Sequence, residues 1–223
     1  MSTTGLISVL FLAYLAVAAA CLRQWNEPNP WSRIDVFSGG FLLASPPWLV
    51  EYLVFMRGIS RSKEVLREAS GAAYDPSMLI WINGVALAEL TVFLDYGHWH
   101  LAPALSVPAL QSAGLALWVL TPAWLLWADR HLARHFSSSE AERHLLTEGP
   151  FHYVRHPRYA GLLVSRAAFA LLFASPLAWL LSGVWVGVVL RHIRLEDAHL
   201  AGLYGAAWES YAARTSRLVP GLY

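Results

Sequence analysis

The chain has 223 residues, of which 57% are hydrophobic and 14% charged, with a formal net charge of +1 at pH 7. In an ordinary soluble domain roughly a quarter of the residues are charged, so the composition excludes such a domain and indicates a membrane protein. The single cysteine, Cys21, excludes an intramolecular disulfide and zinc sites built from several cysteines.

Apolar runs of nearly bilayer-spanning length follow one another along the chain. Because a transmembrane helix needs about 20 apolar residues, we expect an all-α bundle with spans at 5–22, 36–56, 77–95 and 107–127, then a hairpin of 159–174 and 177–192. The first run lacks the basic leading region of a signal peptide and is expected to be retained.

The hairpin and the domain organisation follow from these lengths. Each hairpin arm has about 16 residues, or about 24 Å, which is shorter than the roughly 30 Å hydrocarbon core. Such arms are expected to dip or tilt in the bilayer. We expect one membrane domain, 1–223, with N-terminal spans in 1–127 and, in 128–223, a core that includes the hairpin 159–192 and the tail.

The cationic side chains are distributed unevenly between the two sides of this multi-pass topology. Of the 16 Lys and Arg residues, one side receives 13: Arg57, Arg61, Lys63, Arg67, Arg130, Arg134, Arg143, Arg155, Arg158, Arg191, Arg194, Arg214 and Arg217. The positive-inside tendency assigns that side to the cytoplasm. The loop 57–76 is interpreted as a solvated connector, with lipid recognition as the alternative.

Three ionisable side chains fall within or near the expected spans. Charged groups at membrane depth are costly and therefore candidates for function. Glu51 is close to a basic loop, which favours an interfacial position. Glu89 is expected either to line a polar cavity or to bond another helix. Arg166 needs a partner or a pocket, unless its long side chain reaches the interface.

The histidines offer a metal-binding alternative. His131 with His135, and His152 with His156, stand at helical spacing, and His192 and His199 follow on the same side. This resembles the histidine boxes of membrane di-iron hydroxylases and desaturases, since histidine is the commonest metal ligand. Against it, the sequence has no adjacent His pair, and Pro157 biases His156 away from helical geometry. No metal ligand is therefore assigned.

The most polar stretch, GPFHYVRHPRYAG, lies at 149–161 between two apolar runs. Within HLLTEGPFHYVRHPRYAG it resembles the signature of the membrane methyltransferases that include isoprenylcysteine carboxyl methyltransferases and phospholipid methyltransferases. The tail adds a second match in the right order, with paired acids, a Leu, an aromatic-Gly, two aromatics three apart and a Pro. These are Glu196 and Asp197, Leu200, Tyr204 and Gly205, Trp208 and Tyr211, and Pro220.

The resemblance covers about 127–223 and implies a function. Members of this family are multi-span helical proteins that bind S-adenosylmethionine at the cytoplasmic face under a cap formed by the C-terminal tail. They methylate lipid-borne or lipophilic acceptors. The expected partners are therefore such an acceptor and the bilayer, with no nucleic acid. A Rossmann glycine fingerprint is absent from the sequence, which agrees with the family's separate cofactor fold.

The residues in 144–161 and 192–217 have the chemistry that the donor needs. Arg155 and His156 can hold its carboxylate, acids can accept from its ammonium or ribose, and aromatic rings can contact adenine and sulfonium. The expected cofactor-binding residues are His144, Leu146, Gly149, Tyr153, Arg155, His156, Tyr159, Gly161, Glu196, Asp197, Tyr204, Trp208 and Tyr211. The expected catalytic residues are Glu196, His192 and Arg194.

The tail departs from the family pattern at positions that concern the acceptor. His192 stands where carboxyl methyltransferases carry an Arg, and an imidazole lacks the bidentate fork of a guanidinium. Asp197 replaces a second Glu, and Trp208 replaces a Tyr. The acceptor therefore stays open among an isoprenylcysteine-like carboxylate, a phospholipid amine and a small thiol. A metal oxygenase and a membrane scaffold are the alternatives to a methyltransferase.

Overall fold

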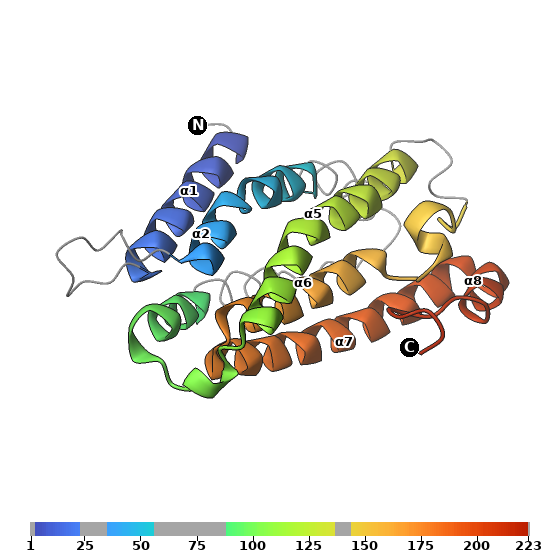
Figure 1. The fold of residues 1–223 in the computed structure, drawn as a ribbon. Coiled ribbons are helices and arrows are strands. Elements are labelled where there is room, and N and C mark those ends of the chain that lie inside the picture. Colours follow the sequence, from blue (N-terminus) through green and yellow to red (C-terminus); the bar gives the residue numbers. More distant parts are fainter. Residues whose placement is uncertain (1–2, 23–34, 56–87, 137–143, 223) are drawn as a thin grey trace. The chain divides into compact units, whose positions relative to one another are not determined.

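The computed structural model describes residues 3–22, 35–55, 88–136 and 144–222 (Figure 1). These ranges are almost entirely helical, and their β pairing consists of an isolated parallel bridge between Val154 and Ser216. The named helices are α1 (Thr3–Leu22), α2 (Val36–Leu43), α5 (Pro108–Phe136), α6 (Pro157–Phe173), α7 (Pro176–Tyr204) and α8 (Ala206–Ala212). Shorter helical turns are η1 (Asp95–Trp99), η2 (Pro103–Leu105) and η3 (Gly149–His152), and further helix is present at 46–55 and 88–94.

Three helices of the described ranges are long and apolar enough to cross a membrane. They are Gly5–Leu22, Pro108–His135 and Pro176–Tyr204. The expectation of an all-α membrane protein is confirmed. The expected loop 57–76 and most of the expected span 77–95 lie outside the described residues.

The expected span 36–56 is divided into two helices. α2 ends at Leu43, and the next helix occupies 46–55. The reason is local. Pro46 and Pro47 cannot donate main-chain hydrogen bonds and are tolerated only in the first turn of a helix, so they start the second helix instead of continuing the first.

The second hairpin arm is much longer than the expected 177–192. α7 has 29 residues, or about 43 Å, whereas α6 has 17. Polarity increases after Leu190, but polarity does not end a helix. The residues that follow are good helix formers, and α7 continues until Gly205, whose φ of 51° ends it. The tail acids therefore lie on α7 itself.

The chain packs as two compact units. The first unit comprises 1–50, 77–121 and 164–185, and the second comprises 51–76, 122–163 and 186–223. In the first unit an aromatic cluster forms the core: the Phe41, Phe93, Phe169 and Phe173 rings are buried and contact one another with centroids 4.8 to 6.1 Å apart. Trp118 adds a ring 5.0 Å from Phe41.

Two prolines leave carbonyl groups in the first unit that side chains satisfy. Pro122 lies inside α5 and lacks the N–H that would bond the carbonyl of Trp118. The Trp48 indole donates to that oxygen over 3.3 Å. Pro176 likewise leaves the Leu172 carbonyl free at the end of α6, and the buried Gln111 amide donates to it over 3.1 Å.

The first unit also answers the question about Glu89. Its carboxylate pairs with the Arg166 guanidinium and accepts a 3.1 Å hydrogen bond from the Tyr14 hydroxyl. Three helices are thus joined by one buried acid. Of the two expectations for Glu89, bonding to other helices is the one that the structure shows.

Candidate functional site

The polar motif at 149–161 belongs wholly to the second unit. It begins with the η3 turn, whose Gly149 has a φ of +60°, and it ends in the first turn of α6. Pro157 is the first residue of α6, a position where its missing N–H costs nothing. The Trp124 indole donates to the Pro157 carbonyl over 2.8 Å. Pro157 therefore fixes the start of α6 in two ways, through its ring and through the hydrogen bond to its carbonyl.

The C-terminal tail runs beside this motif. The main-chain N–H of Arg155 donates to the carbonyl of Ser216 over 2.8 Å, and that of His156 donates to the carbonyl of Arg217 over 3.0 Å. Val154 and Leu218, one from each segment, are both buried. The motif and the tail thus form a short parallel pairing that joins residues about 60 positions apart.

A charged network follows this pairing. His156 is buried, and its Nε2 lies 2.7 Å from Oδ1 of Asp197 on α7. The other oxygen of Asp197 accepts from Nε of Arg217 over 2.7 Å and lies 3.7 Å from an Arg155 nitrogen. Since a carboxylate only accepts, the proton of this contact sits on Nε2 of His156.

Two buried atoms of this network lack hydrogen-bond partners among the described residues. They are Nε of Arg155, a donor, and Oε2 of Glu196, an acceptor. Oε2 of Glu196 lies 3.7 Å from Nδ1 of His156. Buried polar groups are nearly always paired, so a donor and an acceptor left open together indicate the place of a polar ligand.

Aromatic rings surround the same group. Tyr159 contacts two imidazoles, with its ring centroid 5.8 Å from that of His156 and 5.7 Å from that of His192. The Arg155 guanidinium lies 5.8 Å from the Trp208 ring. Trp208 is buried on α8. These rings offer flat apolar surface beside the unpaired polar atoms.

Tyr211 connects α8 to the motif. Its ring lies 5.7 Å from that of Trp208, and its hydroxyl donates to the carbonyl of Phe151 over 2.6 Å. Burial raises the pKa of the Tyr211 hydroxyl, the nearby Arg155 guanidinium opposes that shift, and the Asp197 carboxylate adds to it. Tyr211 is therefore a neutral hydrogen-bond donor.

Gly161 has a packing role. A Cβ there would meet side-chain atoms of Leu125 and Trp124, each at 2.7 Å. The absent side chain lets α6 approach α5 in this unit. Its place among the expected cofactor-binding residues stays a prediction.

Several other expected site residues are exposed or only half-buried. Tyr153 is exposed, with its ring 6.3 Å from that of Trp127. His144 and Arg194 are exposed, and Leu146 and Tyr204 are half-buried. On α7, His192 and Glu196 are one turn apart and share a face, whereas Arg194 lies on another side.

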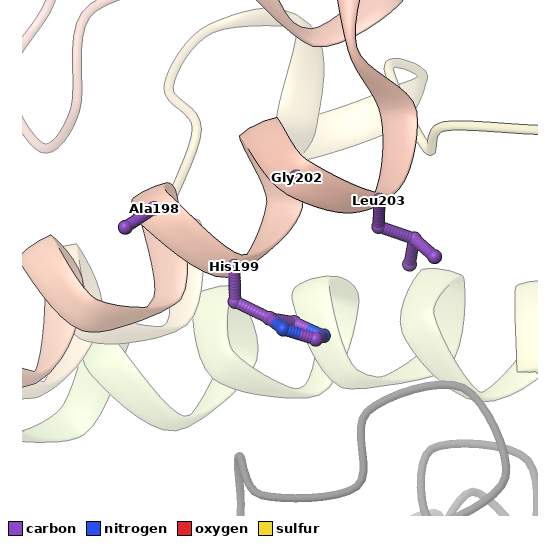
Figure 2. Close-up of a pocket in the computed structure, with 4 residues that line it drawn as sticks. All are labelled: Ala198, His199, Gly202 and Leu203. Carbon is purple, nitrogen blue, oxygen red and sulfur yellow. The ribbon is translucent and has the colours of Figure 1, made fainter.

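A hollow of about 320 Å³ opens along α7, lined by Ala198, His199, Gly202 and Leu203. Figure 2 shows His199 and Leu203 projecting from the same side of that helix. None of the expected site residues lines it. Within the described ranges, no three His, Cys, Asp or Glu side chains come together as a metal site would require.

The sequence interpretation missed two residues of the network. Arg217 is among the expected cytoplasmic-side cations but not among the expected site residues, and Ser216 is in neither group. Ser216 takes part through its carbonyl, which any residue has, so its type carries no signal. Arg217 follows Tyr211 by six positions. A cation in the same tail as two adjacent acids is a possible ion-pair partner for one of them, and this pattern is a sequence signal for Arg217.

Fold and site together define an all-α membrane protein whose motif and C-terminal tail share one buried polar network. Residues 110–207 match the family model described as phospholipid methyltransferase. The resemblance drawn from the two motifs is thereby confirmed.

A curated relative agrees with this assignment. The chain is 26% identical over 157 residues to methanethiol S-methyltransferase 2 of Bradyrhizobium diazoefficiens. The aligned part covers 62% of this chain and 59% of that relative.

Proposed function

We propose that the protein transfers a methyl group from S-adenosylmethionine to a lipophilic or membrane-borne acceptor. The family of residues 110–207 and the name of the relative support methyl transfer. The membrane-length helices support an acceptor that partitions into the bilayer. When bound, S-adenosylmethionine supplies an activated methyl group on a cationic sulfonium.

The proposal rests on two buried atoms near His156 that have no hydrogen-bond partner among the described residues. Nε of Arg155 is a cationic donor and Oε2 of Glu196 is an anionic acceptor. The amino-acid end of the donor molecule carries a carboxylate and an ammonium, which are the complementary charges. Arg155 would hold the carboxylate and Glu196 the ammonium, both through charge-assisted hydrogen bonds.

The aromatic side chains suit the rest of the donor molecule. Tyr159 and Trp208 lie beside the polar network. Their faces can stack on an adenine ring and attract a sulfonium cation. Their apolar surface also excludes water from the reacting atoms, which strengthens the electrostatic contacts made there.

The acceptor that we propose to test first is a small thiol, because the relative is named for methanethiol. A thiol gives up its proton when its sulfur is methylated. His192 shares a face of α7 with Glu196, one turn apart, so its imidazole can take that proton while Glu196 holds the ammonium. An isoprenylcysteine-like carboxylate and a phospholipid amine remain the other acceptor classes.

The first experiment is calorimetric titration of the detergent-purified, metal-stripped protein with S-adenosylhomocysteine. The wild type should bind in the micromolar range, at roughly −8 kcal/mol. Glu196→Ala should weaken binding at least tenfold, since it removes the acceptor for the ammonium. His156→Ala should do the same. The control is Glu209→Ala, which removes an exposed acid from α8.

The second experiment identifies the acceptor. Methyl-labelled S-adenosylmethionine is incubated with the protein in liposomes and with a thiol, an isoprenylcysteine carboxylate or a phosphatidylethanolamine. Label in one extracted product names the class. A folded protein that binds no S-adenosylhomocysteine would contradict the methyltransferase proposal, and bound iron would then favour the oxygenase alternative.

A further inference from the structure

Both oxygens of the Asp197 carboxylate are already occupied within the protein. Oδ1 accepts from Nε2 of His156 and Oδ2 accepts from Nε of Arg217, each over 2.7 Å. The side chain of Asp197 is buried on α7, and the Arg217 side chain is half-buried. An acid with two internal partners is poorly placed to bind a ligand, so its role differs from that of Glu196.

Arg217 is held in place by more than this ion pair. Its carbonyl accepts from the main-chain N–H of His156 over 3.0 Å. One residue earlier, the Ser216 hydroxyl accepts from the N–H of Gly221 over 2.9 Å. Buried side chains lie on either side, at Thr215 and Leu218. The tail therefore presents the guanidinium of Arg217 to Asp197 from a fixed backbone.

This arrangement sets the state of His156. Because Asp197 accepts from Nε2, a neutral His156 ring has its proton on Nε2 and a lone pair on Nδ1. Nδ1 lies 3.7 Å from Oε2 of Glu196, which has no hydrogen-bond partner among the described residues. With a neutral ring, Nδ1 and Oε2 of Glu196 are two buried acceptors that face each other, and a ligand N–H can donate to them.

We propose that Arg217 is a positioning residue of this site. It fixes Asp197 so that the carboxylate selects one tautomer of His156, and that tautomer presents Nδ1 beside Glu196 as a paired acceptor for a ligand N–H. The identity of the ligand, an amino-acid ammonium, rests on the proposed function. The contacts among Arg217, Asp197 and His156 do not.

The test compares Arg217→Gln with Arg217→Lys and with a matched control, Arg214→Gln. Arg214 is an exposed cation of the same tail whose Nε donates to the carbonyl of Ser210. Thermal unfolding first establishes that each variant is folded. Two quantities are then measured: the affinity for S-adenosylhomocysteine, and the ring ¹⁵N chemical shifts of His156, assigned by their loss in His156→Gln.

The wild type should show the ¹⁵N shifts of a single Nε2–H tautomer. Arg217→Gln should move those shifts toward a tautomer mixture and weaken binding about 10- to 100-fold, the range for a hydrogen bond to a charged group. Arg217→Lys should recover part of the affinity and part of the wild-type ¹⁵N shifts, and Arg214→Gln should change neither the affinity nor the shifts. Combining Arg217→Gln with Asp197→Asn should weaken binding no more than Asp197→Asn alone, because both act through one carboxylate.

The outcomes separate this inference from the proposed function. If Arg217→Gln weakens binding but leaves the His156 shifts unchanged, Arg217 only stabilises the tail against the motif, and the positioning role is wrong. Unchanged binding and unchanged shifts contradict it as well. If the wild type binds no S-adenosylhomocysteine, the proposed function fails, while the ¹⁵N shifts still show whether Arg217 sets the tautomer of His156.

Discussion

The hydroxyl of Tyr211 donates to the main-chain carbonyl of Phe151 over 2.6 Å, joining α8 to the polar motif 60 residues earlier. Tyr211 is buried. This contact leads to a prediction about stability. Tyr211→Phe removes the donor and leaves the carbonyl unpaired, and we expect a loss of about 1 to 2 kcal/mol in the free energy of unfolding at neutral pH. Denaturant unfolding in detergent measures it.

The same side chain predicts a dependence on alkaline pH. Burial raises the pKa of the Tyr211 hydroxyl, so the folded state holds this proton more firmly than the unfolded chain does. The resulting stability is present below the unfolded pKa of about 10 and is lost as pH rises through the higher folded value. Stability measured from pH 8 to 11 should therefore fall more steeply in the wild type than in Tyr211→Phe. Equal slopes of stability against pH in the two proteins would contradict the raised pKa of Tyr211.

Gly161→Ala should destabilise the second unit. The added Cβ would meet Leu125 and Trp124 at 2.7 Å, and overpacking of this kind costs about 1 to 3 kcal/mol. Gly187→Ala on α7 is the control, because its Cβ has open space and alanine favours a helix over glycine by roughly 1 kcal/mol. The two changes should shift the unfolding midpoint in opposite directions. A stabilising Gly161→Ala would overturn the packing role.

Gly149→Ala should lower the stability of the protein by more than the strain of a positive φ alone would. Gly149 has a φ of +60°, and a Cβ there would lie 2.5 Å from the ring of His131. That ring is fixed by a 2.9 Å contact between its Nδ1 and the carbonyl of Trp127. The control is Gly205→Ala, at a φ of +51° with open space. Thermal unfolding should show the larger loss at Gly149, and equal losses would mean that His131 moves away freely.

Arg158 holds two buried carboxylates in the second unit. One of its nitrogens lies 2.6 Å from Glu51 and 2.5 Å from Asp129, while its guanidinium lies 3.4 Å from the Phe55 ring. Arg158→Met should cost about 3 to 5 kcal/mol, because it leaves buried charge without a partner. Adding Glu51→Gln and Asp129→Asn should restore much of the loss. A triple variant no more stable than Arg158→Met, by thermal unfolding, would show that charge is not the cause.

Local sequence signals predicted the helices well where hydrophobicity and proline acted together. The apolar run at 5–22 corresponds to α1, and Pro157 starts α6 two residues before the expected first arm. The division of 36–56 was also readable, since the adjacent prolines at 46 and 47 stand in the sequence, but hydrophobicity alone hid it. The extension of α7 to Tyr204 was missed because polarity marks where a bilayer ends and not where a helix ends.

The sequence by itself determined the membrane class, the resemblance to the membrane methyltransferases and the set of residue types near the site. All of these follow from composition and from motifs that are local in the chain. The tertiary structure decided which of those residues meet. Within the described part of the chain, it pairs Asp197 with His156 and Arg217, leaves Glu196 and Arg155 each with one unpaired buried atom, and keeps Tyr153 at the surface. Such pairings depend on the three-dimensional contact of segments far apart in the chain, which no local pattern specifies.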